Sequence, residues 1–197
     1  MIKSMDIPLV RDYKSKEENM DEQRNVSEKR KDLIGWGVYA MVLLAIIIIF
    51  NFILMIGKIP SESMEPTLMV HDWTIGSRLA YDGEKTPERG DIVIFYQQDE
   101  DETMVKRVIG LPEETVSFVG GKVYIDGEPL DESAYLDDSV KTECDETFTV
   151  PEDSYFMLGD NREISLDARY WEHTYITEED MESKVLFVIP FHKLPWF

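Results

Sequence analysis

Residues 33–57 read LIGWGVYAMVLLAIIIIFNFILMIG and contain no charged side chain. A helix of about 20 such residues crosses a hydrocarbon core of roughly 30 Å, so this run is long enough to span a bilayer with some tilt. A core helix of a soluble protein is seldom apolar on every face. A cleaved signal peptide has a shorter charged region and a shorter apolar run. The stretch therefore predicts a single N-terminal transmembrane helix.

Positive charge is distributed unequally around this run. Four basic residues lie within residues 24–31, whereas Lys58 is the basic residue that follows the run closely. Cytoplasmic flanks of membrane spans carry the excess of Lys and Arg. We therefore expect residues 1–32 to form a cytosolic tail, residues 33–57 the membrane span, and residues 58–197 a domain on the outer face of the cell membrane.

The net charge of −20 lies entirely beyond the tail, because residues 1–32 contain eight basic and eight acidic residues. A domain this acidic repels phosphate, so nucleic acid is not an expected partner. Cys144 is the one cysteine, which excludes an internal disulfide. Its neighbours Glu143 and Asp145 disfavour a thiolate, so a catalytic cysteine is not expected either.

The outer domain has the pattern of a mainly β fold. Short aliphatic and aromatic runs alternate with turn signals, and Gly120-Gly121 is typical of a tight hairpin. The expected strands are residues 73–78, 91–96, 104–109, 115–119, 122–125 and 155–158. Residues 177–180 resemble a capping box that opens a short helix. We expect the acidic insert 131–146 to be an exposed loop, and the apolar tail 185–197 to pack on the domain.

Three segments of this domain could carry chemistry. The first, IPSESMEPTL at residues 59–68, holds two serines between two prolines, which stiffen the backbone and exclude a continuing helix. It could equally be a plain linker. The third, GDNREISLDARYW at residues 159–171, is rich in Asp, Asn and Arg for a loop after an apolar strand, and it could equally be a surface turn.

The second segment, VKRVIG at residues 105–110, places a lysine inside an apolar β pattern. Neighbouring strand residues face opposite sides, so we expect Lys106 to point inward and Arg107 outward. Burial disfavours the ammonium ion, and lowering a lysine pKa by about 3 units costs about 4 kcal/mol. Such a cost is reasonable where a neutral amine must accept a proton from a serine. The alternative is an ordinary exposed lysine.

Histidine and metal mechanisms are less favoured. Ser63, Asp160 and His173 could be imagined as a triad, but the chain has no G-x-S-x-G elbow. It also has no H-E-x-x-H motif and no cysteine cluster that would indicate zinc. We expect no metal and no cofactor.

Taken together, the segments resemble the type I (leader) signal peptidases of the bacterial Ser/Lys class. The resemblance rests on the order of an N-terminal span, Pro-Ser-x-Ser-Met-x-Pro-Thr, Gly-Asp-Ile-Val, Lys-Arg-Val-Ile-Gly and Gly-Asp-Asn-Arg-x-x-Ser-x-Asp-x-Arg. It implies a β-rich catalytic domain behind one transmembrane helix. It also implies a membrane-bound enzyme that removes signal peptides from exported precursors. The implied partners are those precursors, the lipid bilayer and the protein-export translocon.

The resemblance also implies roles for residues at matching positions. Ser63 matches the nucleophile and Lys106 its general base. Ser61 matches a side-chain donor of the oxyanion hole, beside the backbone N–H of Ser63. Ser165 matches a serine that orients the lysine. The residues that match structural supports are Asp160, Asp167 and Arg169. The residues that match the apolar walls of substrate pockets for small side chains are Ile59, Leu68 and Val105.

The sequence departs from the family pattern at several positions. Glu113 stands where glycine is common after Lys-Arg-x-x-Gly-x-Pro, and glutamate does not readily adopt the positive φ that glycine allows, so we expect a different turn. Ile164, Ala168 and Glu172 also differ. These differences leave two alternatives to a general signal peptidase: a specialised paralogue that processes pilus or surface proteins, or a catalytically silent assembly factor.

Overall fold

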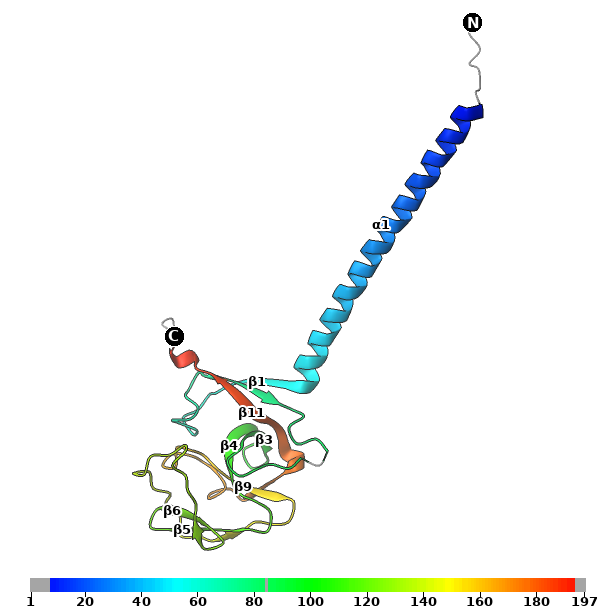
Figure 1. The fold of residues 1–197 in the computed structure, drawn as a ribbon. Coiled ribbons are helices and arrows are strands. Elements are labelled where there is room, and N and C mark those ends of the chain that lie inside the picture. Colours follow the sequence, from blue (N-terminus) through cyan, green and yellow to red (C-terminus); the bar gives the residue numbers. More distant parts are fainter. Residues whose placement is uncertain (1–7, 84, 194–197) are drawn as a thin grey trace. The chain divides into compact units, whose positions relative to one another are not determined.

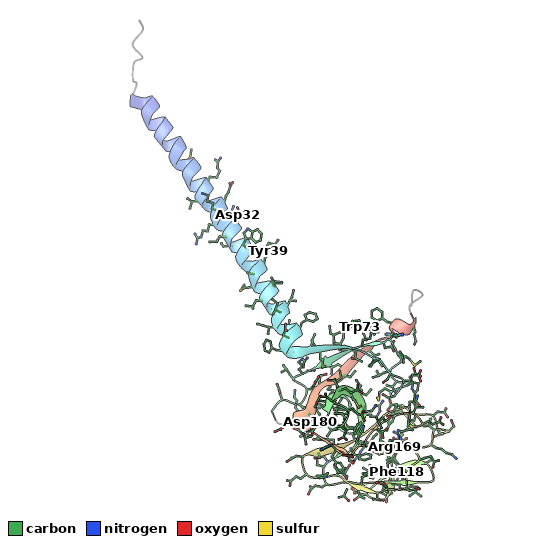
Figure 2. All side chains as sticks on the ribbon, turned by 180° about the vertical axis from the view of Figure 1, so that it is seen from behind. Asp32, Tyr39, Trp73, Phe118, Arg169 and Asp180 are labelled. Atoms are coloured by element: carbon green, nitrogen blue, oxygen red, sulfur yellow. The ribbon has the colours of Figure 1, made fainter. Side chains whose placement is uncertain are left out.

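The structure, a computed structural model, describes residues 8–83 and 85–193, and the chain divides into two compact units between Ile49 and Phe50 (Figure 1). The first unit is the helix α1, Pro8–Ile48. Its apolar side chains project outward, with Trp36 73% and Tyr39 72% exposed (Figure 2). Among the described residues, one helical stretch, Val26–Ile53, is long and apolar enough to cross a membrane.

The helix ends earlier than the sequence indicated. A π-helical segment, Ile49–Ile53, follows α1, and the chain then enters strand β1, Leu54–Lys58. The expected helical run to residue 57 is therefore wrong in its last four residues. An apolar run has the same composition in a helix and in a buried strand. Here antiparallel pairing with β2, Trp73–Ser77, decides the outcome.

The second unit is built from two antiparallel sheets, which confirms the mainly β expectation. One sheet has seven strands in the order β1-β2-β11-β3-β4-β9-β10, and the other has four in the order β7-β6-β5-β8. The remaining strands are β3 (Ile92–Gln97), β4 (Glu102–Gly110), β5 (Thr115–Val119), β6 (Lys122–Ile125), β7 (Glu128–Pro129), β8 (Phe148–Thr149), β9 (Ser154–Leu158), β10 (Tyr175–Thr177) and β11 (Met181–Ile189). Gly120 and Gly121 form the expected β5–β6 hairpin, both with positive φ.

The C-terminal strands were not expected from the sequence. Residues 177–180 carry the predicted capping box, but it opens a single 3-10 turn, Glu178–Asp180, that leads into β11. The backbone of β11 pairs with β2 and β3, and its register shifts between Val185 and Phe187. The apolar side chains at residues 186–189 remain exposed. The expected packing of the tail thus holds for the backbone and not for these side chains, and residues 194–197 lie outside the described part.

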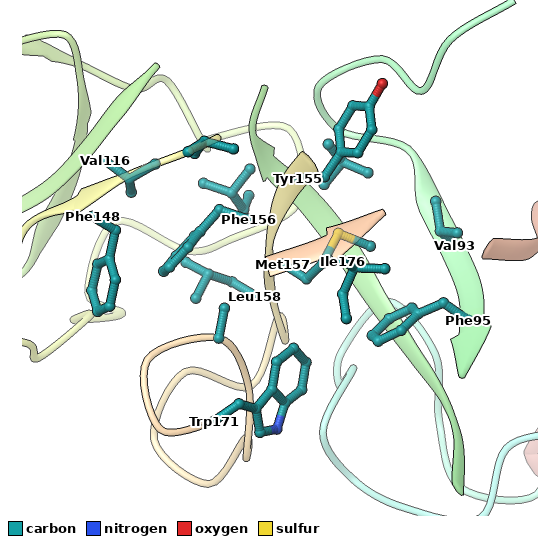
Figure 3. Packing of buried hydrophobic residues seen from close by; sticks show 14 of the residues in the cluster. Val93, Phe95, Val116, Phe148, Tyr155, Phe156, Met157, Leu158, Trp171 and Ile176 are labelled. Atoms are coloured by element: carbon teal, nitrogen blue, oxygen red, sulfur yellow. The ribbon is translucent and has the colours of Figure 1, made fainter. Parts of the chain in front are cut away.

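The core lies around β9, whose five residues are all buried. The ring centroids of Phe148 and Phe156 lie 4.7 Å apart, and Trp171 meets Phe95 edge to face at 5.9 Å (Figure 3). Burying side chains of this size contributes roughly 1.5–3 kcal/mol each. The strand that ends in this core runs directly into Gly159, so the 159–171 loop starts from a rigid position.

Candidate active site

The loop that carries Ser61 and Ser63 lies between β1 and β2, and its two ends are joined. The Ile59 N–H donates to the Asp72 carbonyl at 2.8 Å, and the His71 N–H donates to the Ile59 carbonyl at 3.0 Å. Met64 and Leu68 are buried beneath the loop. The closed ends and this apolar anchor fix the backbone that presents both serines. The two hydroxyl oxygens lie 3.4 Å apart.

The 159–171 loop fastens the serine loop from a second side. The backbone N–H of Asn161 donates to the Ser63 carbonyl at 3.1 Å, and its side-chain Nδ2 donates to the Glu62 carbonyl at 3.1 Å. Thr67 Oγ1 donates to Asp160 Oδ2 at 2.5 Å. Two segments almost a hundred residues apart in the sequence are therefore held in fixed register around Ser63.

Gly159 lies where the two loops approach each other closely. A Cβ atom on Gly159 would lie 2.1 Å from Ser165 Oγ and 2.5 Å from the Ser63 carbonyl oxygen. Only glycine fits there, and its absence of a side chain lets Ser165 approach the Ser63 backbone. Ser165 is buried, and its Oγ has no hydrogen-bond partner among the described residues. A buried hydroxyl in that state is available to orient a neighbouring polar group.

Lys106 lies on β4 opposite Val93 of β3 and is only 4% exposed. Burial lowers the pKa of its amine from 10.5 to about 8. The carboxylates of Asp167 and Glu102 act in the opposite direction and favour the ammonium ion, whereas Arg169 disfavours it. At a pKa of about 8, roughly one amine in ten is neutral at pH 7, compared with about one in 3,000 for an unperturbed lysine.

Lys106 and Ser63 open into the same cleft, which has a volume of about 820 Å³. Ser61 and Glu62 also line it, as does the first half of β4 from Glu102. Apolar side chains dominate the walls; they come from Met55, Ile59, Val70, Ile94, Met104, Val105, Ile164 and Leu166. The cleft thus combines a hydroxyl, a lysine with a lowered pKa and an apolar surface, which suits attack on a peptide carbonyl.

The family model for signal peptidase, peptidase S26, matches residues 32–190. The chain belongs to this family. A signal peptidase IB of Staphylococcus aureus is 32% identical over 180 residues, which cover 80% of this chain and 90% of that protein. The expected family is therefore confirmed.

Two further signal peptidases are more similar over shorter segments. A signal peptidase I of Leptolyngbya laminosa is 44% identical over 121 residues, 57% of this chain and 58% of that protein. A probable signal peptidase I-2 of Synechocystis is 39% identical over 150 residues, 70% of this chain and 64% of that protein. The chain thus spans about three-fifths of the length of these relatives. A crystal structure of an Enterococcus faecalis signal peptidase I, 33% identical, covers 53% of this chain and all of that one, with a TM-score of 0.44.

In the second unit the Lys106–Arg107 pair alternates as expected, but Arg107 does not face solvent. It is 7% exposed, and its Nε and Nη2 bind Asp160 at 2.8 and 2.6 Å. Its guanidinium carbon also lies 3.9 Å from the ring centroid of Tyr135. The expected outward arginine is wrong because Asp160 and Tyr135, which lie far from β4 in the sequence, cover the other face of this strand.

The supports named from the sequence lie together behind the cleft. Arg169 binds Asp167 through Nε at 2.8 Å and through Nη2 at 2.9 Å. Asp167 in turn accepts the Gly159 N–H at 3.1 Å. Of the three predicted pocket residues, Ile59 and Val105 line the cleft. Leu68 does not line it; this side chain is fully buried in a cluster with Ile59 and Met64 and is absent from the described lining.

The imagined histidine triad is not assembled. His173 binds Asp99 at the protein surface, while Asp160 binds Arg107 in the interior. The described residues also contain no group of three or more His, Cys, Asp or Glu side chains that could hold a metal ion. Sequence reasoning missed Met55, Ile94 and Leu166 as cleft residues, because their apolar character carries no signal that separates a cleft wall from a core.

Proposed function

We propose that this chain is a membrane-anchored serine endopeptidase that removes signal peptides from exported precursor proteins. Ser63 is the nucleophile and Lys106 is the general base. One observation carries the proposal: a lysine that burial keeps partly neutral opens into the same apolar cleft as a serine held by two anchored loops. The family membership of the chain supports the same assignment.

In the first step, Ser63 Oγ attacks the scissile carbonyl carbon, and the hydroxyl proton passes to the neutral amine of Lys106. The carbonyl oxygen becomes an oxyanion. The backbone N–H of Ser63 and the hydroxyl of Ser61 are the donors assigned to it, in keeping with the 3.4 Å between the two hydroxyl oxygens. The Lys106 ammonium ion then donates its proton to the leaving amine as the peptide bond breaks, which leaves an acyl-enzyme on Ser63.

In the second step, Lys106 accepts a proton from water, and the resulting hydroxide attacks the acyl carbonyl. The ester bond breaks and the proton returns to Ser63 Oγ, so the enzyme is regenerated without a metal or a cofactor. We assign Ser165 to orient the amine of Lys106. Its buried hydroxyl makes no hydrogen bond to any described residue, so its donor and acceptor capacity is available for that role. The Asp167–Arg169 pair and Asp160 hold the loop and the strand that carry these groups.

The cleft also suits an extended peptide. β9 pairs with β4 from Arg107 onward, so residues 102–105 pair with β3 on one edge and have no strand partner among the described residues on the other. A substrate segment can add its backbone hydrogen bonds at such an edge. Ile59 and Val105 then contact its side chains and favour small ones. A signal peptide that ends in small residues has this character.

The apolar helix supports a membrane location. Residues 33–57 and their basic flank favour a cytosolic tail and a catalytic domain, 58–197, on the outer face. The partners that follow are the bilayer, the precursor and the translocon that delivers it. Nucleic acid is not among the partners, because the acidic outer domain repels the phosphates that a nucleic-acid-binding surface must neutralise.

The deciding experiment compares full-length wild type with Ser63→Ala and Lys106→Ala on a precursor that carries Ala-x-Ala before its cleavage site. We expect both variants to lose cleavage by a factor of about 1,000 or more, since nucleophile and base act as a unit. Ser139→Ala and Lys122→Ala, which change the same residue types at exposed positions, are the matched controls. Undiminished cleavage by both site variants would contradict the mechanism.

Topology is tested separately by adding protease to intact cells. We expect residues 58–197 to be digested and the N-terminal tail to be protected. The reverse pattern would contradict the orientation.

A further inference from the structure

Arg162 connects the acidic insert, residues 131–146, to the loop behind the active site. Its side chain is fully buried. Nη2 and Nη1 bind the two carboxylate oxygens of Glu132 at 2.5 and 3.1 Å, and Nη1 also donates to Thr142 Oγ1 at 2.6 Å. Nε donates to the Gly159 carbonyl at 3.0 Å. One guanidinium therefore holds two residues of the insert and the backbone of Gly159 in one rigid arrangement.

Gly159 is the residue through which a displacement would reach the site. Its Cα lies so close to Ser165 and to the Ser63 carbonyl that a Cβ atom would overlap both. Its N–H is fixed by Asp167 and its carbonyl by Arg162. A shift of that carbonyl by a few tenths of an ångström must move Ser165, because packed interiors transmit displacements rather than absorb them.

Glu132 is the only carboxylate among the described residues that pairs with Arg162. Its side chain is 13% exposed. Removing the partner of a buried charge leaves that charge buried and unpaired, which is strongly unfavourable. Tyr135 donates its hydroxyl to Glu132 at 2.7 Å, and its ring covers Arg107, the neighbour of Lys106. The insert thus reaches both the loop and the strand that carry the site.

None of residues 131–146 lines the cleft in the part of the chain that the structure describes. The insert therefore contacts the 159–171 loop from outside the cleft. The expectation of a plain exposed loop is wrong for Glu132, Tyr135 and Thr142, all of which are at least partly buried.

We infer that Glu132 is a positioning residue, which acts through Arg162 and Gly159 to hold Ser165 and Ser63 in register with Lys106. The role of Lys106 and Ser63 in this inference rests on the proposed function. The positioning itself can be measured without it.

The direct readout is the pH dependence with which a small amine-reactive acylating reagent modifies Lys106, followed by mass spectrometry on the full-length protein. The charged groups that act on Lys106 are Asp167, Glu102, Arg169 and Asp160. Glu132→Gln leaves all of them in place. We expect this variant to loosen the loop, admit water to Lys106 and move the midpoint of modification to higher pH by about half a unit or more. Glu146→Gln, an exposed position in the same insert, should leave the midpoint unchanged.

Cleavage kinetics give the second readout, at a temperature where circular dichroism shows each variant to be fully folded. Glu132→Gln should lower kcat roughly tenfold with little change in KM, because misplaced catalytic groups affect the chemical step. The acidic limb of the pH profile of this variant's activity should move in the same direction as the midpoint of Lys106 labelling. Glu132→Asp, which keeps the charge, should restore part of both effects. A purely structural role would lower the unfolding temperature and leave kcat and the midpoint unchanged, which would overturn the inference.

If Glu132→Gln fails to fold, Tyr135→Phe tests the positioning role of Glu132 instead. It removes only the hydroxyl that supports Glu132, and the inference requires a smaller shift of the Lys106 midpoint in the same direction. An unchanged midpoint and an unchanged kcat would overturn it. If wild type fails to cleave the precursor while Lys106 labelling still responds to Glu132→Gln, the proposed function is wrong and the positioning role stands.

Discussion

Arg107 and Asp160 form a bidentate ion pair on the face of β4 opposite Lys106, with Nε–Oδ1 and Nη2–Oδ2 distances of 2.8 and 2.6 Å. The side chain of Asp160 is fully buried and that of Arg107 is 8% exposed. This pair joins β4, the strand that carries Lys106, to the loop that holds Ser63. Two adjacent residues of one strand are therefore buried in different ways: among the described residues Lys106 forms no ion pair, and Arg107 pairs with Asp160.

Replacing Asp160 with asparagine should destabilise the domain by about 3 kcal/mol, because the buried guanidinium loses its counter-charge. Lys184→Met is the control. It breaks a more exposed pair, Lys184–Asp91 at 2.7 Å, and should cost less than about 1 kcal/mol. Urea unfolding followed by tryptophan fluorescence measures both. If both variants lose the same free energy of unfolding, burial of the Arg107–Asp160 pair does not determine its contribution to stability.

The pKa of Lys106 predicts how activity depends on pH. Burial lowers it to about 8, so the neutral amine, which is the form that the proposed mechanism requires, becomes the major form above that pH. We expect kcat/KM to rise tenfold per pH unit below about pH 8 and to level off above it. Measurements from pH 5 to pH 10 test this, and a flat profile would contradict the lysine base.

Glu102 offers a way to move that profile. It lines the same cleft, and its carboxylate raises the pKa of Lys106 against the effect of burial. Glu102→Gln should therefore lower the pKa of Lys106 further and move the acidic limb of kcat/KM to lower pH. Glu128→Gln, an exposed charge on β7, is the matched control and should not move it. A limb that shifts upward would mean that Glu102 does not act on Lys106 through its charge.

Burial of Lys106 also has a stability consequence. The folded protein gives up the Lys106 proton at about pH 8 and the unfolded chain at about 10.5, so the unfolded state binds more protons between these values. Stability therefore increases with pH across that window, and the full cost of about 3 kcal/mol is present below pH 8. Lys106→Met should be inactive yet more stable than wild type at pH 7 by up to that amount. The difference should vanish above about pH 10.5. Equal stability at pH 7 would show that the amine is better solvated than its burial indicates.

The sequence predicted those features that depend on local pattern. The apolar helix and most strands of the domain follow from hydrophobic periodicity and glycine turns, and the motifs around Ser63, Lys106 and Ser165 pointed to the segments that meet at the cleft. Features set by distant partners were not accessible. β1 is a strand because it pairs with β2, and Arg107 is buried because Tyr135 and Asp160 cover it. Glu132 lies in an acidic stretch where nothing local distinguishes it from its exposed neighbours.

Glu113 gives a last prediction, since the expectation that it would avoid a glycine-like conformation is wrong. Its φ is 67°, and its backbone N–H donates to the Val150 carbonyl at 3.0 Å. A non-glycine residue in this region is strained by roughly 1–2 kcal/mol, while glycine loses roughly 0.5–1 kcal/mol more entropy on folding. Glu113→Gly should therefore stabilise the domain by about 0.5 kcal/mol and raise its Tm by about 1–2 °C. Glu128→Gly, at an exposed position without positive φ, should lower it. If both variants unfold at lower temperature than wild type, the strain at Glu113 is smaller than the entropy that glycine adds.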